Sequence, residues 1–138
     1  MKLFIKTLLL VISLVLISCA KDDQIPANVP ATPSIIGKWE YQKSDTRDGQ
    51  TIISTQSFDP LATCVRNYLN IKSDNKIDLV DHSSPCVAQK QTFTYTLNNN
   101  ILSYSSANRT IEKLTSIDLI LTEPSGPYIT AYYLKKVQ

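Results

Sequence analysis

From residue 35 to the C-terminus, the side chains alternate between polar and apolar in short segments, with the period of a β-strand. In the segment 36–42, Trp39 and Tyr41 fall on one face, and the polar residues between them fall on the other. No stretch of this region predicts an amphipathic helix, whose apolar residues would recur every three or four positions. We therefore expect an all-β domain over residues 35–138.

Turn-forming residues, such as Asp48-Gly49 and Asn98-Asn99-Asn100, separate the segments with this pattern. The expected strands are residues 36–42, 51–58, 65–71, 76–81, 92–97, 101–105, 109–114, 117–121 and 128–135. Eight or nine short strands with short connections are typical of an antiparallel meander, barrel or sandwich.

The first 18 residues have the features of a secretory signal peptide. Lys2 and Lys6 accompany an apolar run over 7–17, which is too short for a membrane span and is followed at once by polar residues. The run ends in Leu16-Ile17-Ser18-Cys19, which resembles a bacterial lipobox. This resemblance implies that Cys19 carries the lipid anchor and that residues 1–18 are removed.

Residues 19–34 form the expected tether between the lipid and the domain. The segment contains three prolines and no apolar periodicity, a composition that favours extended conformations. Lys21, Asp22 and Asp23 follow Cys19 closely and resemble the export signal of surface lipoproteins of the Bacteroidetes. We therefore expect an outer-membrane lipoprotein exposed on the cell surface, and the alternative for these three residues is ordinary tether charge.

Cys64 and Cys86 remain as a pair once Cys19 is assigned to the lipid. Export implies an oxidising compartment, so we expect a disulfide between them. The alternative is two free thiols or half of a metal site, although their spacing is not typical of zinc ligands.

Charge gives no support for a polyanionic partner. The chain has 14 basic and 12 acidic side chains, and two of the basic ones, Lys2 and Lys6, belong to the signal peptide. The remaining charges balance and are interspersed, so nucleic acid is not expected as a partner.

No motif predicts catalysis, a cofactor or a metal. Asp81-His82-Ser83 has the residue types of a catalytic triad, but adjacent residues of a strand point to opposite faces. Asp74, Asp78 and Asp81 lack the glycine and the terminal glutamate of a calcium loop. We expect the protein not to be an enzyme.

Gly37-x-Trp39, directly after a linker, resembles the start of a lipocalin-type barrel. The similarity is closer to the small lipocalin-like domains of Bacteroidetes lipoproteins, which combine such a first strand with a cysteine pair around a central hairpin and a late strand like 115–119. This resemblance implies an antiparallel, eight- or nine-stranded up-and-down barrel with Trp39 plugging one end. Lipocalins place an arginine over this tryptophan; this chain departs from the pattern, and Lys135 or Lys136 is the nearest candidate.

Two functions follow from this reading. The first is a lipid-anchored module that binds a small apolar ligand in or at the mouth of the barrel. The alternative is a protein-interaction or inhibitor module that presents loops on a rigid, filled barrel. The candidate contact residues are the strand tyrosines Tyr41, Tyr95, Tyr128, Tyr132 and Tyr133. The structural alternative is that tyrosine simply suits strands, with its ring inward.

Overall fold

The protein is described here by a computed structural model, which covers residues 32–59, 64–83 and 86–138. The expected signal peptide, Cys19, the expected export signal and most of the tether lie outside the described residues, so their assigned roles stay predictions. The described part is all-β and contains no helix long and apolar enough to cross a bilayer.

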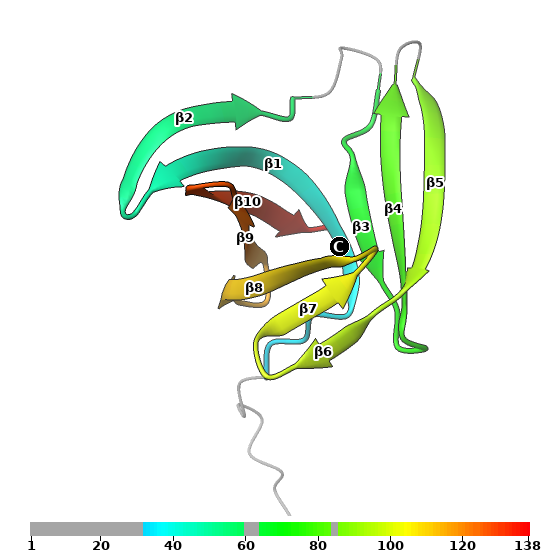
Figure 1. The fold of residues 1–138 in the computed structure, drawn as a ribbon. Coiled ribbons are helices and arrows are strands. Elements are labelled where there is room, and N and C mark those ends of the chain that lie inside the picture. The colour runs from blue at the N-terminus through cyan, green and yellow to red at the C-terminus, as the bar shows by residue number, and fades with distance from the viewer. Residues whose placement is uncertain (1–31, 60–63, 84–85) are drawn as a thin grey trace, which may run out of the picture. The chain divides into compact units, whose positions relative to one another are not determined.

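Ten strands make up the domain, where eight or nine were expected. They are β1 (Gly37–Asp48), β2 (Thr51–Ser57), β3 (Tyr68–Ile71), β4 (Lys76–Ser83), β5 (Val87–Thr94), β6 (Thr96–Asn98), β7 (Ile101–Tyr104), β8 (Ala107–Leu114), β9 (Asp118–Ser125) and β10 (Tyr128–Lys136). The additional strand arises because the segment 92–97 is interrupted at Tyr95, whose backbone N–H donates to the carbonyl of Asn75. The chain then leaves β5, at one end of the sheet, and continues directly into β6, at the other end of the sheet order (Figure 1).

All pairings are antiparallel, and the sheet order is β5-β4-β3-β1-β10-β9-β8-β7-β6, with β2 added to β1. The sheet curls into a nearly closed barrel (Figure 1), which confirms the expected fold class. The first and last strands are neighbours, with Trp39 opposite Lys136 and Arg47 opposite Ile129.

Strand β1 is shared between two parts of the domain. Its first half, Gly37–Glu40, pairs with β3, and its second half, from Lys43 to Asp48, pairs with β2. A shift of register after Tyr41 separates the halves. The β1–β2 hairpin therefore continues beyond the barrel wall as an arm (Figure 1), and all seven residues of β2 are exposed.

The apolar core fills the end of the barrel at which β1 begins. Trp39 is fully buried there, and its indole Nε1 donates to the carbonyl of Ile35 at 2.7 Å. The Nζ atom of Lys136 lies 5.0 Å from the Trp39 ring centre, so this lysine is the basic residue over the tryptophan. The other fully buried apolar side chains of the core are Leu69, Ile71, Ile77, Leu102, Leu119, Leu121 and Leu134.

Gly37 is needed where Lys136 crosses the first strand. Its φ is +135°, and a Cβ atom at this position would lie 2.7 Å from Cε of Lys136. A larger residue would have a strained backbone and would push the lysine away from Trp39.

Cys64 and Cys86 form a disulfide, as expected. The bond connects the segment that precedes β3 with the residue that precedes β5. It therefore joins two chain segments at the end of the barrel opposite to Trp39.

Trp39 provides the first test. Its emission should be blue-shifted in the folded protein and move to the red on unfolding, because the chain has one tryptophan and that ring is fully buried. Trp39→Ala should lower the free energy of unfolding by about 3–5 kcal/mol, as for other large core truncations. Chemical denaturation followed by circular dichroism measures the change, with Ile53→Ala on the exposed arm as the control. Water-like emission and a near-neutral Trp39→Ala would contradict this packing.

Candidate functional site

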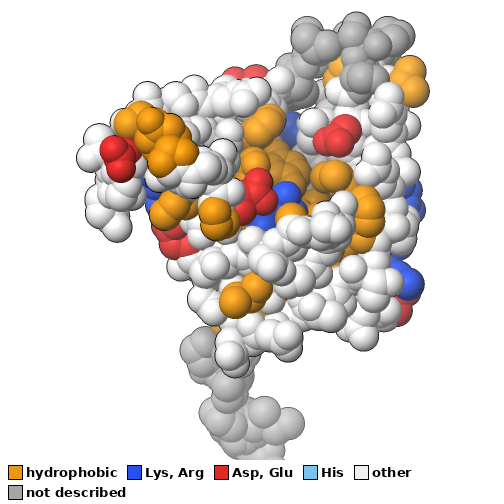
Figure 2. Space-filling view, in the orientation of Figure 1, with side chains coloured by type: hydrophobic (Ala, Val, Ile, Leu, Met, Phe, Trp, Pro, Cys, Tyr) orange, Lys and Arg blue, Asp and Glu red, His pale blue; other side chains and the backbone are white. Residues whose placement is uncertain are grey.

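The interior of the barrel changes from apolar to polar along its length. On β9, the inward positions run Leu119, Leu121 and then Glu123, and on β8 Arg109 lies in phase with Ile111. The polar positions therefore gather at the end opposite to Trp39. Figure 2 shows acidic and basic side chains among hydrophobic ones in a hollow of the face that it presents.

This open end holds a pocket of about 180 Å³. Its lining residues come from β1, β4, β8, β10 and the connection between β2 and β3. They are Tyr41, Phe58, Asn67, Leu79, Asp81, Arg109 and Tyr132. We call this the open-end pocket. Asn67 is held in place because its Oδ1 accepts from the backbone N–H of His82 at 2.7 Å, and its carbonyl accepts from the N–H of Tyr41 at 3.0 Å.

An ion pair lies beside the pocket. Nε of Arg109 lies 2.8 Å from Oε2 of Glu123, and the two side chains are only 17% and 21% exposed. The hydroxyl of Tyr132 donates to Oε1 of the same carboxylate at 2.7 Å. Strands β8, β9 and β10 are consecutive in the sheet, and this places the three side chains together.

Aromatic rings surround this ion pair. The guanidinium carbon of Arg109 lies 4.6 Å from the ring centre of Tyr104 and 5.8 Å from that of Tyr132. The ring of Tyr41 contacts Phe58 and Tyr132, at centroid distances of 5.6 and 6.0 Å. These tilted and edge-on arrangements are favourable aromatic geometries, so the walls of the pocket support one another.

The phenols of the pocket keep their protons at neutral pH. Burial raises the pKa of Tyr132 to about 12, and its hydrogen bond to Glu123 adds to the effect. Burial also raises the pKa of Tyr41 well above its ordinary value, and the neighbouring Tyr104 raises it further. Burial raises the pKa of Tyr104 as well. All three hydroxyls therefore remain hydrogen-bond donors, and that of Tyr132 donates its proton to Glu123.

Two buried polar groups beside the pocket lack a hydrogen bond of normal geometry to any described residue. They are the hydroxyl of Tyr104, although Tyr41 lies next to it, and the guanidinium of Arg109, both at Nη1 and at Nε, which is ion-paired with Glu123. Buried groups of this kind are uncommon, because each one loses its bonds to water without replacement.

The five candidate tyrosines lie in four different places. Tyr41 and Tyr132 meet in the open-end pocket. Tyr95 is buried at the apolar end, where its hydroxyl donates to the carbonyl of Lys72 at 3.0 Å. Tyr128 is 40% exposed where the β9–β10 turn enters β10, and Tyr133 lies on the outer face of β10. Their roles in binding stay predictions.

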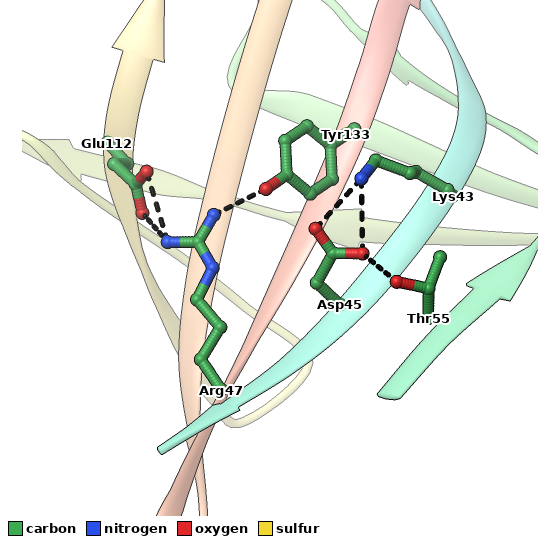
Figure 3. A network of polar contacts seen from close by, with 6 residues as sticks. All are labelled: Lys43, Asp45, Arg47, Thr55, Glu112 and Tyr133. Carbon is green, nitrogen blue, oxygen red and sulfur yellow. Dashed lines mark hydrogen bonds and ion pairs between the residues drawn. The ribbon is translucent and has the colours of Figure 1, made fainter. Parts of the chain in front are cut away.

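Tyr133 belongs to a polar network on the outer face of the barrel (Figure 3). Its hydroxyl accepts a hydrogen bond from Arg47, which also forms an ion pair with Glu112 at 2.9 Å. Beside it, the buried carboxylate of Asp45 accepts from Nζ of Lys43 and from the hydroxyl of Thr55, at 2.9 and 2.7 Å.

Burial raises the pKa of Asp45, but these hydrogen bonds outweigh burial and leave the pKa below its ordinary value. Asp45 therefore remains charged, and its hydrogen bond with Thr55 connects β1 to β2.

Arg109, Glu123 and Tyr104 were not among the residues expected to form a site. The sequence does contain a signal for two of them. Arg109 is in phase with Ile111, and Glu123 is in phase with Leu121, so each charge falls on the core side of its strand. Opposite charges on the core side of adjacent strands predict a buried ion pair.

An antiparallel barrel filled at one end and hollowed at the other is a lipocalin-like architecture, and comparisons of structure bear this out. A lipocalin-like protein from Bacteroides uniformis ATCC 8492 superposes with a TM-score of 0.57 and 14% identity, covering 74% of this chain and 97% of that one. An uncharacterized protein from Bacteroides eggerthii DSM 20697 gives a TM-score of 0.53 and 11% identity, covering 75% and 100%. No protein-family model and no curated protein matches the sequence.

Glu123 provides the second test. Glu123→Gln should lower the free energy of unfolding by roughly 3–5 kcal/mol, because it leaves the charge of Arg109 buried without its partner. The double variant Arg109→Met/Glu123→Leu should lose less than Glu123→Gln alone, since it removes both charges. Denaturant titrations of the three proteins measure this. A double variant that loses as much stability as Glu123→Gln, or more, would contradict the expected cost of the unpaired buried charge.

Proposed function

We propose that this chain is an outer-membrane lipoprotein, exposed on the cell surface, whose lipocalin-like barrel binds a small ligand at its open end. One observation supports the binding role above all. The open-end pocket combines aromatic walls with a buried guanidinium that has an unused donor, while the other end of the same barrel is filled. Apolar walls with convergent polar groups are features that small-molecule sites share.

The charged residues that line the pocket change the class of ligand, which the sequence led us to expect to be a small apolar molecule. A wholly apolar molecule would remove water from Asp81 and Arg109 without replacing their hydrogen bonds, which is unfavourable. The ligand we propose therefore presents an apolar surface to Tyr41 and Phe58 and polar groups to the charged side of the pocket.

The membrane role rests on the sequence of the first 23 residues. A lipobox ending at Cys19 would place the protein on a membrane, and Lys21, Asp22 and Asp23 would direct it to the cell surface. The Bacteroides origin of both similar structures supports this reading, because the export signal is of the Bacteroidetes type.

A second candidate function is docking of a partner protein on the arm. Ile52 and Ile129 both pair with Arg47, from opposite sides of β1, and they are 51% and 41% exposed. Ile53 and Tyr128 are exposed at the same end of the domain. Exposed apolar patches of this kind are commonly protein interaction sites.

Cys19→Ala tests the membrane role. We expect the wild-type protein to partition into detergent and to incorporate labelled fatty acid, and we expect the variant to lose both properties, because the thiol is the attachment point.

In the same cells, external protease should degrade the wild type, and replacement of Lys21, Asp22 and Asp23 by alanine should protect it without loss of acylation. A wild-type protein found in the soluble periplasmic fraction would contradict the anchor.

Tyr41→Ala tests the binding role. Native mass spectrometry of the full-length protein, purified in detergent and mixed with small-molecule extracts, should detect bound molecules. Occupancy should fall about tenfold in Tyr41→Ala, the effect of losing one good contact. Tyr128→Ala is the control, because its ring is exposed away from the pocket. Equal occupancy in wild type and Tyr41→Ala would contradict binding at the open end.

A further inference from the structure

The chemistry of the open-end pocket restricts the class of ligand, on the assumption that the proposed binding function holds. Nη1 of Arg109 is a buried donor without an acceptor among the described residues, and the hydroxyl of Tyr104 is also unpaired there. Arg109 also lines the open-end pocket, so a ligand that enters it stabilises the complex most if it carries an acceptor for the guanidinium. A ligand whose only polar group is a cation cannot supply that acceptor.

The charges around the pocket disfavour an anion. Arg109 is already paired with Glu123, and Asp81 lines the same pocket. At the rim, Arg66 donates to the carbonyl of Phe58 at 3.0 Å and is paired with Asp59. The two positive charges are thus opposed by three negative ones, so the net charge around the pocket disfavours a carboxylate ligand. The acceptor must therefore belong to a neutral group.

The remaining constraints are size and the aromatic walls. A volume of about 180 Å³ is below the roughly 300–1,000 Å³ of pockets for drug-sized ligands, so it has room for about one ring. Tyr41, Phe58 and Tyr132 present apolar surfaces to that ring. Asp81 supplies an acceptor, Asn67 supplies a donor and an acceptor, and Arg109 supplies donors.

We infer that the open-end pocket binds one ring of a neutral, hydroxyl-rich ligand, that is, a neutral sugar residue. The hydroxyls of such a ring both donate and accept, so they match Asp81 on one side and Arg109 on the other. Its C–H face packs on the aromatic walls. A second pocket shares Phe58 and Asn67 with the first and also contains Arg66 and His82, so the next unit of a chain of sugars would meet further polar groups there.

Ligand-observed NMR on the full-length protein, in a detergent without sugar groups, tests this inference. The probes are the methyl glycosides of glucose, galactose and N-acetylglucosamine, the matched glucuronic and galacturonic acids, and cyclohexanol as a mainly apolar ring. At least one neutral sugar should bind about tenfold more tightly than cyclohexanol, which has a single hydroxyl; this is the ratio that one charged hydrogen bond supplies. The same sugar should bind about tenfold more tightly than its matched acid, whose charge the carboxylates around the pocket repel.

Two variants locate the binding. Arg109→Lys should weaken neutral-sugar binding about tenfold, because it removes the Nη1 donor while keeping the charge. Asp81→Asn should weaken neutral-sugar binding, because it replaces one acceptor oxygen by a donor, and it should shift the preference toward the matched acid, because it removes one negative charge from the pocket. The emission of Trp39 verifies that each variant is folded, and Tyr128→Ala is the control.

The outcomes separate this inference from the binding function on which it rests. Preference for the uronic acids, or binding of cyclohexanol alone, in either case abolished by Tyr41→Ala, would overturn the sugar assignment and leave the binding function in place. Binding of a neutral sugar that Arg109→Lys does not affect would also overturn the assignment of the pocket. If no probe binds in a way that depends on Tyr41, both proposals fail.

Discussion

The pairing of β1 with β10 is the constraint on which the rest of the structure depends. It joins the two halves of the domain, β5-β4-β3-β1 and β10-β9-β8-β7-β6, into one sheet, whose end strands β5 and β6 are consecutive in the chain. The same pairing sets Trp39 opposite Lys136 at one end and Tyr41 opposite Leu134 further along. Because side chains alternate along a strand, this register fixes which residues enter the barrel at every level. Both the filled end and the open-end pocket follow from it.

The Trp39 end supplies stability that the polar end cannot supply. A buried Arg109–Glu123 pair loses much of its hydration, and its mutual attraction offsets that loss only when further hydrogen bonds are made. Tyr132 provides one of those bonds, but Nη1 of Arg109 remains without one. Stability therefore rests on the packed leucines and isoleucines around Trp39. The polar end is left free to be selected for binding.

The sequence was sufficient for the fold class and for the disulfide. Alternation over residues 35–138 is a local property, and it carries the information that strands form and which side of each is buried. The count of strands was too low by at least one because the break at Tyr95 depends on a hydrogen bond to Asn75, 20 residues earlier in the chain. The exposure of β2 was also not predictable, since Ile52 and Ile53 are as β-branched and apolar as a core strand.

The candidate site was less accessible from the sequence, because it is made by residues from distant segments. Tyr41 and Tyr132 were expected to be candidates from their strands, but nothing local indicated that these two share a pocket while Tyr95 and Tyr133 do not. Their separation depends on depth along the barrel and on which face of β10 each residue occupies. Such information comes from the register of strand pairing, which is set by non-local contacts.

The rim of the open-end pocket is fixed by covalent and ionic contacts at the same end. Arg66 donates to the carbonyl of Phe58, and the adjoining pocket is bounded by Cys64 of the disulfide. These contacts hold Phe58 and Asn67 against Tyr41 before any ligand arrives. A site already ordered in this way loses little conformational entropy on binding, so a small pocket can still give useful affinity. The disulfide is therefore placed where it supports the proposed site, while the apolar end, which has its own core, has no need of it.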